Sequence, residues 1–294
     1  MHPAKCGFAV FLGMLASIVW PMPAWCSTIR DDEPDSAYVT LGNDQAFAAV
    51  GTLVNSWSYT GCGILIAPNW VLTAAHLFTA ASSVTFTIGG TSYTSTTLIR
   101  NPGWDGNPDD GSDFGLVHLG SSLTPIPPAM LYTGPSLTGQ TGTFVGYGFT
   151  GTGLTGWRTL DGKKRAFQNV IDGDFGKPAK ELGADFDNPH STTNNIFGDA
   201  TPLTLEGCAA PGDSGGGVFV QDGSQYYLAG VISTVASAGG PANSSYGNMT
   251  GFDPVSSVMP WIIATVPEPS TCLLAAAGLV VFWGAKRRRV KKRD

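Results

Sequence analysis

Residues 211–217 read PGDSGGG, and this short stretch narrows the fold and the chemistry of the chain more than any other. Glycines on both sides of Ser214 permit unusual backbone angles and leave room for a substrate carbonyl group to approach the serine hydroxyl. A hydroxyl is a poor nucleophile until a base removes its proton, and an acid must orient that base. The stretch therefore predicts a partner histidine and a partner carboxylate elsewhere in the chain.

Two earlier segments supply a base and an acid. Residues 70–76, WVLTAAH, predict a strand that runs into His76 through small residues. Residues 112–119, SDFGLVHL, place Asp113 directly before an apolar strand. The other acids nearby are Asp105, Asp109 and Asp110. None of them directly precedes the strand, so we predict that His76 and Asp113 act together with Ser214.

The order of these residues along the chain argues against two other hydrolase folds. Gly212, Ser214 and Gly216 also fit the nucleophile elbow of α/β-hydrolases, but that fold needs its catalytic histidine after the serine. The histidines of this chain are His2, His76, His118 and His190. All of them precede Ser214. A subtilisin order of acid, histidine and serine could use Asp44, but the helix-rich pattern of that fold is missing.

The composition favours short strands joined by tight turns. Gly and Pro make up a fifth of the 294 residues, and only 13% of the residues are charged. Runs rich in Val, Thr and Phe predict strands at 48–54, 63–66, 71–73, 84–88, 114–119, 142–146, 217–220 and 226–233. We expect residues 149–207 to be mostly loops, and the apolar spacing from Val255 to Val266 predicts a helix. Two packed barrels of about 110–120 residues each would account for the length.

The order histidine, aspartate, serine resembles that of chymotrypsin-like serine peptidases. The VGYG motif at 145–148 and Trp261-Ile262 in the final helix are also similar to that family, and the resemblance covers roughly residues 45–266. It implies an all-β fold of two packed six-stranded Greek-key barrels with a short C-terminal helix. In that fold the active site lies between the barrels.

The resemblance also implies a role for each residue of the site. His76 would be the general base, Asp113 would orient it, and Ser214 would be the nucleophile that forms an acyl-enzyme. The backbone N–H groups of Gly212 and Ser214 would form the oxyanion hole. The implied function is an endopeptidase that acts on proteins or peptides without a cofactor or metal. A catalytically inactive binding module and an esterase on the same scaffold are the alternatives.

Specificity and activation are likewise implied by the resemblance. Cys208 lies where the family places the floor of the specificity pocket, and Ser233 and Val235 would line one wall. These residues predict a small or medium apolar side chain before the scissile bond, with Arg and Lys excluded. The buried acid beside the nucleophile, Asp213, would pair with a new N-terminal amine, for which Ile29 is the candidate.

The cysteines depart from the family pattern. Leu77 stands where many relatives have a cysteine, and Cys62 lies next to the usual position of the partner. Two cysteines in an exported domain could form one disulfide, but the placement of Cys62 and Cys208 argues against their pairing. No Cys/His cluster has the spacing of a zinc site.

Both ends of the chain read as sorting signals. Residues 1–27 have a positive start, an apolar run and a small-residue cleavage site, as a secretory signal peptide does. Residues 266–270, VPEPS, precede an uncharged run at 269–285 and a basic block. This pattern resembles the PEP-CTERM sorting signal, which implies transient contact with the inner membrane and processing by an exosortase-type enzyme. A plain tail anchor is the alternative for this segment.

We therefore predict a peptidase domain at 28–266 between a signal peptide and a sorting segment at 267–294. The predicted destination is the periplasm, the cell surface or the extracellular space. Without its two ends the chain carries eight basic and 20 acidic side chains, a net charge of −12. Such a surface repels phosphate backbones, so nucleic acid is not an expected partner.

Overall fold

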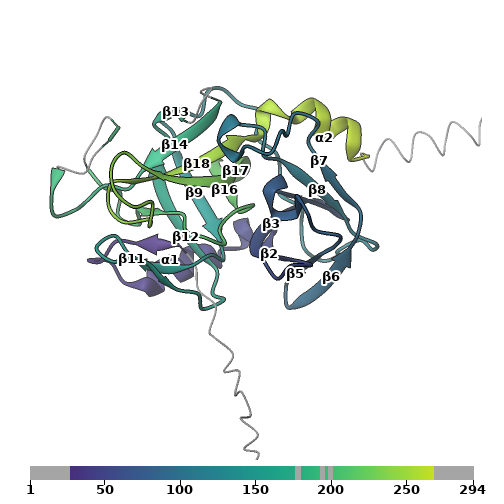
Figure 1. Cartoon of the computed structure of the whole chain (residues 1–294), viewed down its shortest axis with the longest axis horizontal. Helices are drawn as coiled ribbons and strands as arrows, with labels where there is room; N and C mark the ends of the chain where they lie inside the picture. The colour runs from purple at the N-terminus through teal and green to yellow at the C-terminus, as the bar shows by residue number, and fades with distance from the viewer. Residues whose placement is uncertain (1–26, 176–179, 193–195, 198–200, 268–294) are drawn as a thin grey trace, which may run out of the picture.

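The computed structural model of the chain describes residues 27–175, 180–192, 196–197 and 201–267. Two large antiparallel sheets form two lobes that lie side by side (Figure 1), one built from the first half of the chain and one from the second. We call them the N-terminal barrel and the C-terminal barrel. The predicted export signal up to residue 26 and the predicted sorting tail from residue 268 lie outside the described residues.

The N-terminal barrel is one sheet with the strand order β6-β5-β2-β3-β4-β8-β7. Its strands are β2 (Val50–Asn55), β3 (Thr60–Ala67), β4 (Trp70–Thr73), β5 (Val84–Ile88), β6 (Thr91–Ser95), β7 (Leu98–Arg100) and β8 (Gly115–His118). Only two residues separate β6 from β7, yet these strands lie at opposite edges of the sheet. Strands β6 and β7 therefore form one bent segment that joins the two edges. Counted as one strand, this segment closes the sheet into a barrel of six strands.

The C-terminal barrel closes in the same way, with the strand order β12-β9-β16-β17-β18-β14-β13. Its strands are β9 (Thr141–Gly146), β12 (Arg165–Val170), β13 (Gly173–Phe175), β14 (Glu181–Asp185), β16 (Gly217–Asp222), β17 (Gln225–Ser237) and β18 (Asn248–Pro254). Here β12 and β13 form the bent segment, and each strand has the same neighbours as its counterpart in the first barrel. The predicted fold class is confirmed.

Each of the eight predicted strand runs coincides with a strand, because apolar side chains face the interior in these runs. In β5, for example, Val84, Phe86 and Ile88 are buried, whereas the threonines between them are partly exposed. Residues 149–207, which we expected to be mostly loops, contain strands that the sequence did not predict, among them β12, β13 and β14. Inward positions of β12 and β14 hold Arg165 and Glu181 rather than apolar residues, so the alternation that marks a strand is absent.

Each end of the described chain packs on the barrel made by the other half. The first residues form β1 (Thr28–Ile29) in a small sheet of order β11-β10-β1-β15. The other strands of this sheet are β10 (Thr150–Thr152), β11 (Gly156–Thr159) and β15 (Gly207–Cys208). Helix α1 (Asp35–Gly42) then packs against β12, and its Tyr38 is buried in the C-terminal barrel.

The predicted helix near the C-terminus is confirmed as a 3-10 turn (Val255–Ser257) followed by α2 (Met259–Thr265). Its apolar side chains, including Val258 and Ile262, belong to the core of the N-terminal barrel. Figure 1 shows α2 lying against that barrel. In the part of the chain that the structure describes, no helix is long and apolar enough to span a membrane.

Candidate active site

The pairing of β4 with β8 brings His76 and Asp113 together. The two strands are antiparallel, with Thr73 at the end of β4 opposite Gly115 at the start of β8. His76 follows the first strand and Asp113 precedes the second, so both lie at the same edge. His76 Nδ1 is 2.5 Å from Asp113 Oδ2, and the His76 backbone N–H donates to Asp113 Oδ1 at 2.8 Å.

Asp113 is fully buried, and the C-terminal barrel supplies two of its hydrogen-bond partners. The Ser233 hydroxyl donates to Asp113 Oδ2 at 2.7 Å, and the Asp113 backbone N–H donates to Asp253 Oδ2 at 2.7 Å. Of the alternative acids, Asp110 accepts hydrogen bonds from Ser112. Sequence reasoning missed Asp253, because an acid inside an otherwise apolar strand gives no signal of its neighbours.

Burial raises the pKa of Asp253 to about 9, and the negative charges of Glu181 and Asp113 add to this rise. Glu181 lies on β14 beside β18, and burial raises its pKa to about 8. Burial therefore favours the protonated form of both carboxyl groups at neutral pH. It thus disfavours a second negative charge behind Asp113.

The loop before β16 presents Ser214 to the N-terminal barrel. The Cys62 N–H on β3 donates to the Ser214 carbonyl oxygen at 2.8 Å, which joins the two barrels at Ser214. Gly215 has φ 79°, and a Cβ there would lie 2.2 Å from the Cys62 carbonyl oxygen. Only glycine allows this close approach, which explains the glycine after Ser214 in the sequence.

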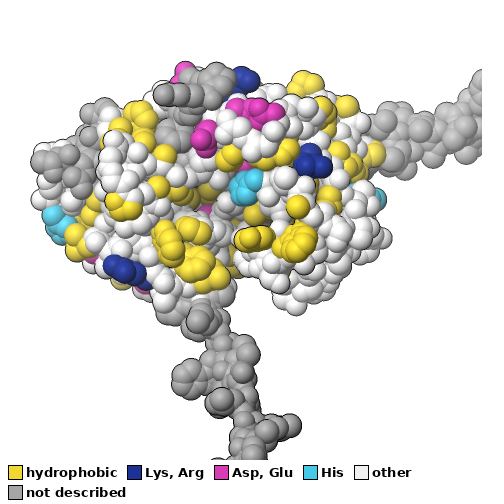
Figure 2. Space-filling model, in the orientation of Figure 1, with side chains coloured by type: hydrophobic (Ala, Val, Ile, Leu, Met, Phe, Trp, Pro, Cys, Tyr) yellow, Lys and Arg dark blue, Asp and Glu magenta, His cyan; other side chains and the backbone are white. Residues whose placement is uncertain are grey.

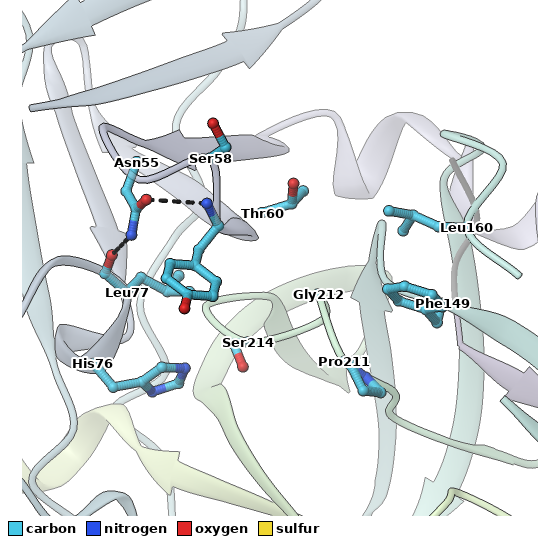
Figure 3. A pocket seen from close by; sticks show the side chains of 11 residues that line it. Asn55, Ser58, Thr60, His76, Leu77, Phe149, Leu160, Pro211, Gly212 and Ser214 are labelled. Atoms are coloured by element: carbon cyan, nitrogen blue, oxygen red, sulfur yellow. Dashed lines mark hydrogen bonds between the residues drawn. The ribbon is translucent and has the colours of Figure 1, made fainter. Parts of the chain in front are cut away.

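Ser214 and His76 line one cleft between the two barrels, with a volume of about 560 Å³. Figure 3 shows their side chains next to each other at one side of this cleft. Both residues are partly exposed, so a substrate could reach them. The lining residues are Asn55, Ser58, Tyr59, Thr60, His76, Leu77, Phe149, Leu160, Pro211, Gly212 and Ser214.

Two backbone N–H groups beside the Ser214 hydroxyl have no protein acceptor within the described residues: those of Gly212 and Ser214. The N–H groups of their neighbours are all bonded, Asp213 to Ala210 and Gly215 to Ile232. Gly212 has φ 91°, a left-handed conformation that glycine adopts without strain. Two unpaired donors at a nucleophile can stabilise an oxyanion.

Asp213 is buried beside Ser214, and its carboxylate accepts hydrogen bonds from Gly148 N at 2.8 Å and Ala210 N at 2.9 Å. The VGYG motif has glycine at 146 because a Cβ there would lie 2.2 Å from Asp213 Oδ1. The Ser27 hydroxyl also donates to Asp213, at 2.9 Å.

Ile29, whose amine we expected to pair with Asp213 after cleavage, does not lie beside Asp213 in the uncleaved chain. Ile29 lies in β1, between β10 and β15, and its backbone faces Thr152 and Gly207. A residue in the middle of a sheet cannot turn its nitrogen toward Asp213 as well. Ser27, two residues earlier, occupies that place.

The residues expected to form the specificity pocket lie together, but they do not line the cleft described above. Cys208 packs with Phe186 and Tyr246, and Val235 contacts this cluster. Thr250 lies opposite Val235, accepts a hydrogen bond from Ala209 N at 2.9 Å and donates to Cys208 Sγ at 3.4 Å. Ser233, expected in a pocket wall, instead directs its hydroxyl at Asp113.

Both described cysteines are buried and unpaired. Burial raises the pKa of the Cys208 thiol to about 12 and that of the Cys62 thiol well above its ordinary value. Leu77 fills the space of the missing disulfide, because a Cβ on Gly61 would lie 2.5 Å from the Leu77 side chain.

The Cys62 thiol has a role that the sequence did not suggest. It donates to the Gly212 carbonyl oxygen at 3.2 Å and accepts a hydrogen bond from the Tyr147 N–H at 3.2 Å. It thus holds two loops of the C-terminal barrel from a strand of the N-terminal barrel.

Comparisons with known proteins agree with this geometry. The trypsin family model matches residues 42–262, three quarters of the chain, and the PEP-CTERM protein-sorting motif matches residues 265–289. The sorting motif indicates export and C-terminal processing. No curated protein resembles the chain closely enough to be matched with it.

Among solved structures, that of HL collagenase is similar, with a TM-score of 0.54 at 20% sequence identity. The match covers 74% of this chain and 92% of the collagenase. At this identity the likeness shows a shared fold alone.

Proposed function

The chain belongs to the trypsin family, and we propose that it is a serine endopeptidase that hydrolyses peptide bonds through an acyl-enzyme on Ser214. The observation that carries this proposal is the His76–Asp113 pair, joined at 2.5 Å, in the same cleft as Ser214. His76 takes the proton of the Ser214 hydroxyl, and Asp113 holds the imidazole in the required tautomer.

The N–H groups of Gly212 and Ser214 stabilise the oxyanion of the tetrahedral intermediate. Such a pair of fixed donors contributes to catalysis because it needs no rearrangement when the charge develops. The hydrogen bond from Cys62 Sγ to the Gly212 carbonyl supports this role, since it fixes the peptide that carries one of the donors.

A serine-directed phosphonate inhibitor tests the proposal. We expect one equivalent to label Ser214, as identified by mass spectrometry of the digested protein, and no label on Ser214→Ala. A folded protein that takes up no label and cleaves no peptide would instead be the inactive binding module.

For the residue before the scissile bond, we propose a small apolar side chain. Val235 and the rings of Phe186 and Tyr246 pack around Cys208, and Cys208, Val235 and Thr250 carry no charge. A buried Arg or Lys would therefore lie unpaired there, which is costly. Peptide amides that differ at this residue test it: cleavage after Ala or Val is expected, and preferred cleavage after Arg would contradict it.

We place the N-terminus of the active form at Ser27. Cleavage after Cys26 would free an α-amine beside Asp213, to which the Ser27 hydroxyl already donates. Ser27 has φ 47°, which is strained for a non-glycine residue, and a terminal residue has no such constraint. Sequencing of the active protein should begin at Ser27, and one added glycine should inactivate it. Full activity with a tag before Ser27 would overturn this assignment.

The sorting motif supports a destination beyond the inner membrane, in the periplasm, at the cell surface or outside the cell. We propose that an exosortase-type enzyme removes the tail after transient contact of residues 269–285 with the membrane. Mass spectrometry of the protein from cell fractions should find a C-terminus near residue 267. Intact tails in every fraction would show a retained anchor.

A further inference from the structure

The cleft beside Ser214 extends well beyond the residues that the reaction needs. It does not include Cys208, Ser233 or Val235, which we assign to the acyl side of the substrate, so it lies on the other side of the nucleophile. Figure 2 shows hydrophobic side chains on both sides of a hollow between the two barrels.

One wall of the cleft comes from the hairpin between β2 and β3. Tyr59 is 69% exposed at this hairpin and lines the cleft. The buried Asn55 holds the hairpin, because its side-chain amide donates to the Leu77 carbonyl at 2.6 Å and its oxygen accepts from Trp57 N and Tyr59 N. The wall is therefore fixed before a substrate arrives (Figure 3).

The opposite wall comes from the C-terminal barrel. Phe149 and Leu160 are partly exposed and line the cleft, and Figure 3 shows them across from Ser58 and Thr60. The Phe149 ring meets the Trp157 ring edge-on, with a centroid distance of 5.2 Å, which fixes its position. The two walls thus offer an aromatic side chain each, with Leu77 at the base beside His76.

The chemistry decides which part of the substrate lies here. In the acylation step a bond forms between Ser214 Oγ and the carbonyl carbon, and the carbon–nitrogen bond breaks. The proton that His76 took from Ser214 passes to the leaving nitrogen. The leaving segment must therefore lie on the side of His76, where this cleft is.

We propose that the cleft binds the segment after the scissile bond and selects large apolar or aromatic side chains in it, with Tyr59, Leu77 and Phe149 as the specificity-determining residues. This inference rests on the proposed peptidase function. An apolar side chain between the two rings loses its contact with water, whereas glycine would leave the rings exposed.

Capture of the acyl-enzyme by amino-acid amides tests this proposal. The protein is acylated with a small peptide methyl ester, and glycinamide, leucinamide or phenylalaninamide competes with water for the acyl group. We expect the two apolar amides to give about tenfold more transfer product than glycinamide at equal concentration. Equal capture of all three amides would overturn the proposal.

Substitutions in the two walls of the cleft test which side chains produce this preference. Tyr59→Ala and Phe149→Ala should each reduce the preference for phenylalaninamide over glycinamide several-fold. Leu154→Ala is the matched control, since Leu154 is 63% exposed in the turn between β10 and β11 and does not line the cleft. It should leave both the preference and the ester hydrolysis rate unchanged. An unchanged preference in Tyr59→Ala, whose exposed side chain is not needed for folding, would remove Tyr59 from the site.

The ratio of phenylalaninamide product to glycinamide product distinguishes a failure of this inference from a failure of the proposed function. Both products form from the same acyl-enzyme, so the ratio does not depend on how active a variant is. Failure of the peptidase proposal appears as the absence of any acyl-enzyme, or as an acyl-enzyme that forms from the methyl ester but not from a peptide amide. Failure of this inference alone appears as an active peptidase whose acyl-enzyme shows no preference among the amides.

Discussion

The two barrels have the same strand connectivity but very different interiors. The N-terminal barrel is filled by apolar side chains such as Leu53, Ile64 and Phe86. Among the charged residues that are buried in the described chain, only Asp113 belongs to that barrel. The others are Lys164, Arg165, Glu181, Asp185, Asp187, Glu206, Asp213 and Asp253. All of these come from the second half of the chain.

This difference shows that one fold can be stabilised in two ways. Burial of apolar surface does not depend on pH, whereas a buried carboxyl group prefers its neutral form. Burial raises the pKa of Glu181 and of Glu206 to about 8 each. Arg165 is instead paired, with Asp35 at 2.6 Å and with both oxygens of Asp161.

The largest effects should come from the three residues that the barrels contribute jointly to the site. We expect His76→Ala, from the N-terminal barrel, and Ser214→Ala, from the C-terminal barrel, to lower kcat by about 10⁴–10⁶ with little change in KM. Asp113→Asn should lower kcat by about 10⁴, because His76 is then held in the wrong tautomer. Peptide hydrolysis by the purified variants measures these values.

Circular dichroism of the same variants is the control, since each should keep the wild-type spectrum. If Asp113→Asn retained more than about a tenth of the wild-type activity, the orienting role would move to Asp109 or Asp110.

The second effect is a pH dependence of the free energy of unfolding, which distinguishes the interior of the C-terminal barrel from that of the N-terminal barrel. An acid with a raised pKa in the folded state binds more protons there than in the unfolded chain, so its stabilisation is complete below about pH 4.5 and declines as the pH rises through 8. We expect the free energy of unfolding, measured by urea titration, to fall by several kcal/mol between pH 5 and pH 9. Glu181→Gln should make this fall smaller, because one titrating group is removed.

Two variants serve as controls for this pH effect. Phe86→Ala in the N-terminal barrel should cost about 3–5 kcal/mol by leaving a cavity, and the cost should be equal at pH 5 and pH 9. Asp222→Asn replaces an exposed acid of the C-terminal barrel and should leave the pH dependence unchanged. A flat wild-type profile would mean that the C-terminal barrel is stabilised like its partner.

The smallest effect concerns Cys62, through which the N-terminal barrel holds the Gly212 peptide of the C-terminal barrel. Cys62→Ala removes the hydrogen bond to Gly212 and should lower kcat about tenfold at nearly constant KM. Cys62→Ser keeps a donor and an acceptor and should restore most of the rate. Equal loss in both variants would indicate a packing role rather than a positioning one.

The contrast between the barrels also explains which parts of the fold could be predicted from sequence. Strand β5 was predictable because its buried residues are apolar and alternate with threonine. Strands β12 and β14 were not, because Arg165, Asn169 and Glu181 face inward and hide the period of two. Helix α1 has few apolar residues and was missed as well, since contacts with β12 rather than its own pattern hold it.

The candidate site was predictable where a motif reports local chemistry. His76, Asp113 and Ser214 each follow from a short stretch of sequence. Asp253 and the thiol of Cys62 lie far from these stretches in sequence and reach them only through the packing of two barrels. The position of Ser27 beside Asp213 was not predictable either, because it depends on how β1 enters its sheet.

The segment around helix α2 determines when the N-terminal barrel can finish folding. The N-terminal barrel is synthesised first, yet Val255, Val258 and Ile262 of its core lie just before the sorting motif, and Val266 lies within it. Until these side chains arrive, the apolar surface that they cover stays open to water. If the chain is exported from its N-terminus to its C-terminus, the core of the N-terminal barrel can be completed only after this last segment has crossed the membrane. Folding to the native state would therefore follow the end of transport.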